Sequence, residues 1–143
     1  MSRPAMAPLY EAQATAIGGR TGAAATPDGR LRVTLATPEE LGGGGGPGTN
    51  PEQLLALGYA ACFLAAIRRV AGQAGIDIAA DSNVTATIGL RLREDGEELG
   101  LEVALAADLP GIEDRTAAEL LHRARNACPF SDAMRGAPAL SLA

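Results

Sequence analysis

The sequence predicts an α+β fold in which an antiparallel sheet packs on two main helices. Residues 84–92 and 99–107 alternate apolar and polar side chains with the two-residue period of half-buried strands. Residues 54–71 form a long apolar stretch, and residues 116–128 carry an apolar stripe, so both segments suit helices. The resulting order is short strands, helix, long hairpin, helix and a final strand. This order favours the α+β class over a parallel α/β sheet.

The first fifty residues predict short strands joined by glycine-containing turns. A first strand is expected over 9–16, and Gly18-Gly19 then makes a turn that presents Arg20. Residues 21–26 and 30–37 read as a hairpin around Pro27-Asp28-Gly29, a favourable turn sequence. The glycine-rich run 42–48 is a loop, because glycine and proline disfavour regular structure.

The signals for the first helix lie directly after this loop. Asn50 is a sound N-cap, Pro51 suits the first helical position, and Gln53 stands where a capping box would place it. From residue 54 to 71 the helix is apolar nearly all round, which predicts burial on most of its sides. Gly72 or Gly75 is expected to end it.

The second half predicts a hairpin, a second helix and a last strand. Asp95-Gly96 between the two alternating stretches is a strong hairpin signal. Thr116 and Glu119 form a capping box for the second helix, and Pro129 is expected to stop that helix. A short strand is predicted over 139–142.

Length and composition limit the classes of function. With 143 residues, the chain suits one domain spanning 1–143. Its net charge is −5 without a basic cluster, which disfavours nucleic-acid binding. The start lacks the apolar core of a secretory signal, and the longest apolar stretch reads as a core helix, not a membrane span. A cytoplasmic location follows, where paired cysteines serve redox chemistry or metal binding more often than structure.

The two cysteines are the candidate reactive groups. Cys62 lies mid-helix among apolar residues, and by itself it reads as an inert core thiol. Chemistry would need its thiolate, which burial disfavours and the distant helix N-terminus cannot stabilise, so a nearby cation such as Arg20 is required. Cys128 ends the second helix, where an anion is disfavoured, and should be the weaker acid. With His122 as the single histidine, a closed zinc site is not expected.

Three motifs carry a family resemblance over nearly the whole chain. The segments Gly42–Leu54 and Gly58–Phe63, the latter reading GYAACF, resemble the first signature of the organic hydroperoxide resistance (Ohr) proteins of the Ohr/OsmC family. Cys128–Ala133, reading CPFSDA, resembles their second signature. Gly18-Gly19-Arg20 is a third and weaker match. The sequence departs from the family at Phe130 and Asp132, where Tyr and Asn are usual, so the setting of Cys128 differs.

The resemblance implies an OsmC-like fold, an intertwined homodimer and a thiol peroxidase without cofactor or metal. Cys62 would reduce an organic hydroperoxide, alkyl or fatty-acid, and become a sulfenic acid that Cys128 converts to a disulfide. Arg20 would stabilise the Cys62 thiolate, and Glu52 would pair with Arg20. A dihydrolipoyl group or lipoylated protein would reopen the disulfide.

Other interpretations stay open at this point. Arg20 alone reads as a solvated turn residue, and Glu52 as a charge that complements the helix dipole. On one straight helix Glu52 and Cys62 would lie roughly 15 Å apart, so an Arg that reaches both requires a later helix start or a site shared between chains. The alternatives for function are an OsmC-type peroxidase, a non-catalytic redox sensor and a carrier of hydrophobic ligands.

Overall fold

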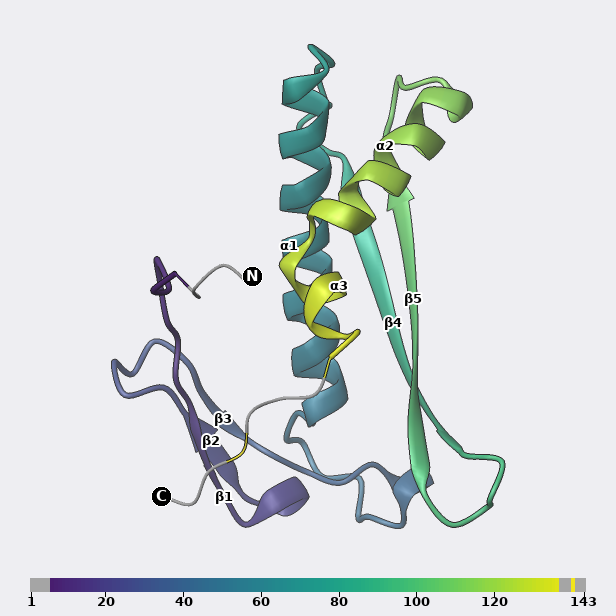
Figure 1. Cartoon of the computed structure of the whole chain (residues 1–143). Helices are drawn as coiled ribbons and strands as arrows, with labels where there is room; N and C mark the ends of the chain where they lie inside the picture. The colour runs from purple at the N-terminus through teal and green to yellow at the C-terminus, as the bar shows by residue number, and fades with distance from the viewer. Residues whose placement is uncertain (1–5, 137–139, 141–143) are drawn as a thin grey trace, which may run out of the picture. The chain divides into compact units, whose positions relative to one another are not determined.

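The computed structural model of the chain describes residues 6–136 and Leu140. The chain divides into two compact units, residues 1–51 and residues 52–143. Each unit has its own antiparallel sheet, and Figure 1 labels the helices and strands of both. The α+β class and the antiparallel pairing predicted from the sequence are thereby confirmed.

The first unit contains a three-stranded sheet in the order β1-β2-β3. Its strands are short: β1 (Thr15–Ile17), β2 (Ala23–Ala25) and β3 (Arg32–Thr34). A 3₁₀ helix, η1 (Gly19–Thr21), connects β1 to β2, and a second, η2 (Glu39–Leu41), follows β3. The predicted hairpin is confirmed, although its strands are shorter than the alternating pattern suggests.

The predicted first strand over 9–16 is wrong in its extent. β1 begins at Thr15, and Leu9 and Tyr10 are exposed outside the strand. The reason lies in β2, which offers β1 only three partners, since the register runs from Thr15 opposite Ala25 to Ile17 opposite Ala23. Residues that precede Thr15 have passed the end of β2 and find no backbone to pair with.

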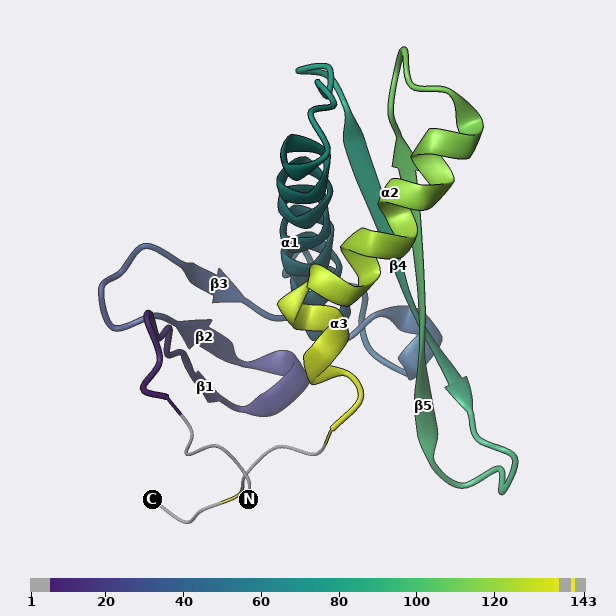
Figure 2. The ribbon, with the colours of Figure 1, turned by 45° about the horizontal axis from the view of Figure 1, so that its top comes forward.

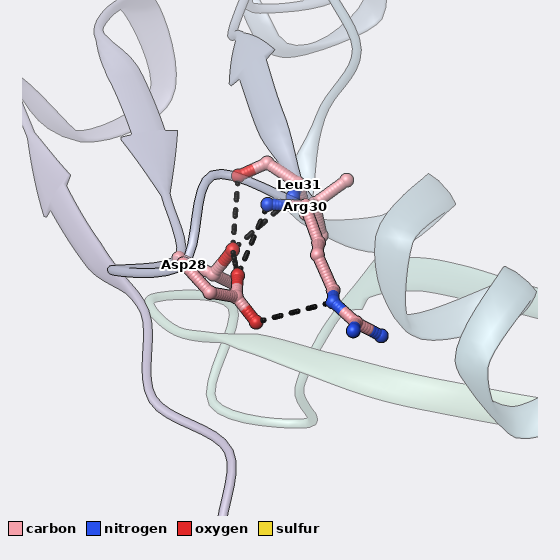
Figure 3. Close-up of polar contacts among 4 residues, drawn as sticks. Asp28, Arg30 and Leu31 are labelled. Atoms are coloured by element: carbon pink, nitrogen blue, oxygen red, sulfur yellow. Dashed lines mark hydrogen bonds and ion pairs between the residues drawn. The ribbon is translucent and has the colours of Figure 1, made fainter.

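Hydrogen bonds of the Thr26 and Asp28 side chains close the turn between β2 and β3 (Figure 3). Thr26 donates its hydroxyl hydrogen to Asp28 Oδ1 at 2.7 Å, and the backbone N–H of Arg30 donates to the same oxygen at 3.0 Å. The Thr26 hydroxyl in turn accepts the backbone N–H of Leu31 at 3.1 Å. Gly29 supplies the left-handed conformation, with φ of 73°, that this turn requires.

Helix α1 (Pro51–Gln73) opens the second unit and starts at the proline, as predicted. Its C-terminal end is a Schellman motif: the N–H of Ile76 donates to the carbonyl of Ala71 at 2.9 Å, and that of Gly75 donates to Gly72 at 3.1 Å. Gly75 adopts φ of 71°, so it is the predicted helix-ending glycine. Ile76 also packs against the core, as the motif's apolar contact requires.

One face of α1 forms the core of the second unit. Its buried residues recur with helical spacing and are Tyr59, Phe63, Ala66, Ile67, Val70 and Ala71. By length and composition α1 would be able to cross a membrane, but this face makes it the core helix of a folded unit. Burial on most sides, however, is not observed within one chain, because Leu57 is 72% exposed and Ala61 and Ala65 are exposed as well.

The long hairpin is confirmed as β4 (Asn83–Leu92) and β5 (Leu99–Asp108). The antiparallel register places Val84 opposite Ala107 and Leu92 opposite Leu99, so the apolar residues of both strands share one face. Near the start of β4 this face packs on the core. The polar face carries an ion pair between Arg91 and Glu102.

Helix α2 (Asp114–Ala127) and the short α3 (Pro129–Ala133) complete the second unit. Figures 1 and 2 show both helices lying across α1 and the hairpin from the same side. The predicted capping box is wrong: α2 starts at Asp114, directly after the Gly111 turn, so Thr116 already lies inside the helix. Pro129 ends α2 but also begins α3, since proline at a first helical position loses no hydrogen bond. The strand predicted over 139–142 lies outside the described residues, apart from Leu140.

Candidate active site

The second unit brings the two cysteines into contact. Cys62 lies on α1, and Cys128 lies between α2 and α3. Both are free thiols, and their Sγ atoms are 3.7 Å apart. Cys128 is 1% exposed, whereas Cys62 is half-buried. A pair with one accessible and one enclosed sulfur suits a reaction in which Cys62 meets the substrate and Cys128 acts second.

The sequence spacing of the apolar stripes explains this contact. Leu120, Ala124 and Cys128 follow one another at intervals of four residues, so they share one face of α2 and its end. All three are buried in the core that also contains Tyr59 and Phe63 of α1. Cys62, next to Phe63, packs against this core. The same hydrophobic burial that docks α2 on α1 therefore positions the two thiols.

A second contact runs beside the cysteine pair. The hydroxyl of Tyr59 and that of Ser131 form a buried hydrogen bond of 2.7 Å. The ring of Phe130 lies against the ring of Tyr59, with centroids 5.7 Å apart and a tilt of 60°. The backbone of α1 also lies close to the Phe130 ring at Gly58, since a Cβ added to Gly58 would lie 3.3 Å from that ring.

The groups of the second unit raise the pKa of the Cys62 thiol. Burial is the largest cause, because it disfavours the charged thiolate, and the side chain of Cys128 adds to the rise. The backbone N–H of Phe130 opposes this effect and lowers the pKa, but it does not outweigh burial. The contacts within the second unit therefore disfavour the Cys62 thiolate. The cation that the sequence argument expects beside Cys62 stays a prediction.

The other two predicted site residues lie on different units. Arg20 belongs to η1 of the first unit, directly after two glycines with left-handed backbone, Gly18 and Gly19. Glu52 lies in the first turn of α1. Because α1 is helical from Pro51 onward, Glu52 and Cys62 are separated along its axis by roughly 15 Å. A later helix start is thereby excluded, and the pairing of Arg20 with Glu52 and Cys62 stays a prediction.

A pocket of about 420 Å³ is lined by residues of both helices that carry the cysteine motifs, although neither cysteine is among its lining residues. Tyr59, Phe63 and Ser131, which line it, are sequence neighbours of the two cysteines. The rest of its wall comes from α2, β5 and the segment after α3: Val103, Leu105, Leu121, Arg125, Met134 and Arg135. Arg125 and Arg135 thus bring two positive charges to this wall.

Sequence reasoning missed the contact between Tyr59 and Ser131. Its signal was nevertheless present, because Tyr59 precedes Cys62 by three residues and Ser131 follows Cys128 by three. On a helix such spacing places two residues on one face. For metal binding, the part of the chain that the structure describes holds no group of three or more suitable ligands. His122 is exposed.

The second unit is an α+β structure with two thiols in contact between its helices, and comparison with known proteins identifies its family. The family model of OsmC-like proteins matches residues 42–143. An organic hydroperoxide resistance protein of Xanthomonas axonopodis pv. citri is 43% identical over 128 residues, covering 90% of this chain and 89% of its own.

Solved structures of organic hydroperoxide resistance proteins are also similar to this chain. An organic hydroperoxide resistance protein of Legionella pneumophila superposes with a TM-score of 0.83 at 44% identity, covering 91% of this chain and 93% of its own. The organic hydroperoxide resistance protein OhrB of Bacillus subtilis gives 0.81 at 37% identity, with coverage of 90% and 93%. The chain belongs to the Ohr/OsmC family, as its two cysteine motifs predict.

Proposed function

We propose that this protein is a thiol-dependent peroxidase that reduces organic hydroperoxides to alcohols. The observation that carries the proposal is the contact between two free thiols, 3.7 Å apart, of which Cys62 is half-buried and Cys128 enclosed. The names of the relatives, organic hydroperoxide resistance proteins, support a role in handling such peroxides.

The first step is attack by Cys62. Its thiolate attacks the terminal oxygen of the hydroperoxide, and the O–O bond breaks. The sulfur is oxidised to a sulfenic acid, while the alkoxide takes up a proton and leaves as an alcohol. In the second step the sulfur of Cys128 attacks that of Cys62. A disulfide forms, the S–O bond breaks, and the oxygen leaves with the thiol proton as water.

Arg20 is proposed to supply the missing cation. Its guanidinium would stabilise the Cys62 thiolate and orient the peroxide, and Glu52 would hold the guanidinium in place through charge-assisted hydrogen bonds. The axial distance of roughly 15 Å between Glu52 and Cys62 makes a site assembled from more than one chain the simpler arrangement. The proposal therefore includes a homodimer, and it treats residues 1–143 as one functional domain.

The pocket lined by Tyr59, Phe63 and Ser131 suits an organic substrate. Its apolar wall from Phe63, Leu105 and Leu121 would bury an alkyl chain, whereas hydrogen peroxide would gain nothing from it. A dithiol reductant of the lipoyl type completes the cycle. Its two thiols reduce the Cys62–Cys128 disulfide and are themselves oxidised to a disulfide. Neither metal nor organic cofactor enters these steps, and a cytoplasmic location provides the reducing surroundings they need.

The proposal is tested by peroxide consumption. Purified protein is given cumene hydroperoxide or hydrogen peroxide together with dihydrolipoamide, and Cys62→Ser and Cys128→Ser variants are compared with the wild type. We expect turnover of cumene hydroperoxide well above that of hydrogen peroxide and its loss in Cys62→Ser. In Cys128→Ser a single turnover should leave a sulfenic acid.

Two outcomes would contradict the proposal. A disulfide that forms but does not turn over with any dithiol would favour a redox sensor. Binding of apolar ligands that Cys62→Ser leaves unchanged, without peroxide consumption, would favour a carrier.

A further inference from the structure

We propose that the hydrogen bond between Tyr59 and Ser131 is a positioning device that holds Cys128 against Cys62, so that disulfide formation outpaces a second oxidation of Cys62. The part that concerns oxidation by peroxide rests on the proposed function. The part that concerns the geometry of the thiol pair does not.

Two contacts join the α1 segment that carries Cys62 to the segment that carries Cys128. Tyr59 stands one helical turn before Cys62, and Ser131 stands three residues after Cys128. The same two segments thus meet twice, at 2.7 Å between the hydroxyl oxygens and at 3.7 Å between the sulfurs. Both hydroxyl-bearing residues are buried, at 5% and 8% exposure, so water cannot readily replace either partner.

The segment that carries Cys128 has few other restraints of this kind. It passes from α2 into α3, a helix of only five residues, with Cys128 as the junction. Two hydrogen bonds from this segment end on the Cys62 sulfur itself, one from the Phe130 backbone N–H and one from the Cys128 thiol. The Tyr59–Ser131 pair is the hydroxyl–hydroxyl hydrogen bond that joins α3 to α1 among the described residues, and it does not depend on the redox state of the sulfurs. The Phe130 ring adds a packing contact with Tyr59, but such a contact tolerates sliding in a way that a buried hydrogen bond does not.

Disulfide formation is sensitive to this restraint. A disulfide needs the sulfurs to close from 3.7 Å to about 2.05 Å with a defined dihedral angle. While Cys62 is a sulfenic acid, a second hydroperoxide competes with Cys128 for the same sulfur. That reaction would give a sulfinic acid and a second alcohol, and the product is not reduced by ordinary thiols. Anything that loosens Cys128 therefore shifts the partition toward the sulfinic acid.

The variants are matched in pairs. Tyr59→Phe and Ser131→Ala each remove one hydroxyl and keep the remaining shape. Tyr10→Phe is the control for the first, since Tyr10 is 83% exposed, and Ser82→Ala is the control for the second. Ser82 is buried and its hydroxyl has no partner among the described residues. Ser131→Thr keeps a hydroxyl and serves as the rescue variant.

The first measurement needs no peroxide. Reduced protein is equilibrated with mixtures of reduced and oxidised glutathione, and the effective concentration of the Cys62–Cys128 pair is obtained from the disulfide fraction. We expect Tyr59→Phe and Ser131→Ala to lower it about tenfold, because a displacement of a fraction of an ångström from reacting geometry has effects of this order. The double variant should resemble either single one, since one bond is lost in each case.

The second measurement uses cumene hydroperoxide. Mass spectrometry of single turnovers should show slower disulfide formation and a larger sulfinic fraction in Tyr59→Phe and Ser131→Ala than in the controls. Sulfenic acid formation, followed in a Cys128→Ser background, gives the rate of the first step separately for each variant, so that a defect in substrate binding is not counted as a defect in disulfide formation. Thermal unfolding verifies that each variant is folded. If Tyr59→Phe does not fold, Ser131→Ala and Ser131→Thr decide the question.

Failure of this inference is distinct from failure of the proposed function. Glutathione equilibria in Tyr59→Phe and Ser131→Ala that match those of wild type and controls would overturn the positioning role, whatever the peroxidase activity. A wild type that consumes no hydroperoxide, with the glutathione equilibria shifted as expected, would leave the positioning role intact and sink the peroxidase.

Discussion

The reactivity of the site depends on the balance of influences on the Cys62 thiol. Burial and the Cys128 side chain raise its pKa, and the Phe130 N–H lowers it. A raised pKa leaves a thiol uncharged at neutral pH, so the second unit alone provides proximity but not nucleophilicity. The proposed role of Arg20 is to lower the pKa of Cys62.

This balance predicts how a substitution of Arg20 will act. In Arg20→Gln the pKa of Cys62 should lie above its ordinary value of 9.0, and the wild-type pKa should lie below it. The rate of alkylation by iodoacetamide as a function of pH, in a Cys128→Ser background, measures both. Arg30→Gln, at an exposed arginine of the same unit, is the control. Equal alkylation profiles for Arg20→Gln and wild type would refute the assigned role.

The same shift affects stability in the Arg20→Gln variant. A pKa raised in the folded state means that unfolding favours the thiolate. The contribution of Cys62 to stability is therefore fully present below the pKa of the unfolded thiol and is lost as pH rises through the folded pKa. Urea unfolding of reduced Arg20→Gln should show stability falling above about pH 9. Adding Cys62→Ser should remove the part of that fall due to this thiol.

A substitution at Gly58 should affect the rate of disulfide formation without changing the free energy of unfolding. In Gly58→Ala, the gain in helix propensity of up to about 1 kcal/mol is offset by the contact of the new methyl group with the Phe130 ring at 3.3 Å. We expect little net change in the free energy of unfolding but slower disulfide formation, since Phe130 must shift. The control is Gly72→Ala in the same helix, where an added Cβ meets nothing within 4 Å. Identical disulfide kinetics in both variants would contradict this prediction.

At the residue scale, the sequence identified the reactive groups but not what holds them. Cys62 and Cys128 stand in specific motifs, so their pairing was predictable from the resemblance. The Tyr59–Ser131 bond was not, because its two partners are 72 residues apart and meet only once α2 has docked on α1.

Among the elements, the best predictions came from turns with a specific chemical requirement. Asp28 and Gly29, Gly75, and Gly96 each satisfy a hydrogen bond or a positive φ at the predicted place. Predictions failed where partners elsewhere set the boundary, as for β1, whose length is limited by β2, and for α2, which begins at the Gly111 turn. Periodicity within one segment contains no information on where a neighbouring segment ends.

The β2–β3 turn gives a prediction with a defined pH dependence. Hydrogen bonds from the Thr26 hydroxyl and the Arg30 backbone N–H lower the pKa of Asp28 below 3.8. Its contribution to stability is therefore present above the unfolded pKa and is lost as pH falls through the folded one. Asp28→Ala should increase hydrogen exchange of the β2 and β3 amides at neutral pH.

Asp28→Asn separates the charge from the hydrogen bonds. Its side-chain oxygen still accepts both hydrogens, so protection of the amides should largely persist but no longer depend on pH below 4. If Asp28→Ala exchanged as slowly as the wild type, the turn would not depend on this side chain.

At the scale of the whole molecule, a single chain leaves much apolar surface uncovered. The apolar face of the β4–β5 hairpin is packed at one end, whereas near the turn Leu92 and Leu101 are 59% and 50% exposed. Leu57 on α1 is exposed in the same way. An exposed apolar patch on one face of a hairpin is characteristic of protein interfaces. One chain leaves the all-round apolar character of the first helix unexplained, and the proposed homodimer would explain it.

The contacts made by this exposed apolar surface cannot be predicted from one chain. Sequence patterns predicted that the first helix would be buried on most sides, and resemblance predicted an intertwined homodimer. In the proposed homodimer, the residues that would cover Leu57 and Leu101 depend on the symmetry of the pair, which is not encoded in the periodicity of one segment. The chain that would supply Arg20 to a given Cys62 depends on the same symmetry.

The homodimer leads to a test with a matched control. Leu101→Lys places a charge on the exposed apolar face, whereas Ala104→Lys places it on the opposite, polar face of β5, which also carries Glu102. Burying an unpaired charge costs several kcal/mol, so Leu101→Lys should weaken dimerisation by about 100-fold or more. Ala104→Lys should leave it unchanged. Sedimentation velocity over a range of protein concentrations measures both.

The peroxidase activity of the same variants then addresses whether the site is shared. If each site is assembled from both chains, activity of Leu101→Lys should fall as dilution dissociates it and return at high protein concentration, because the pKa of Cys62 rises when Arg20 is lost. A dissociated variant with full activity would confine the site to one chain. A Leu101→Lys protein that stays dimeric at all concentrations would show that this face is not the interface, and the uncovered leucines would need another partner.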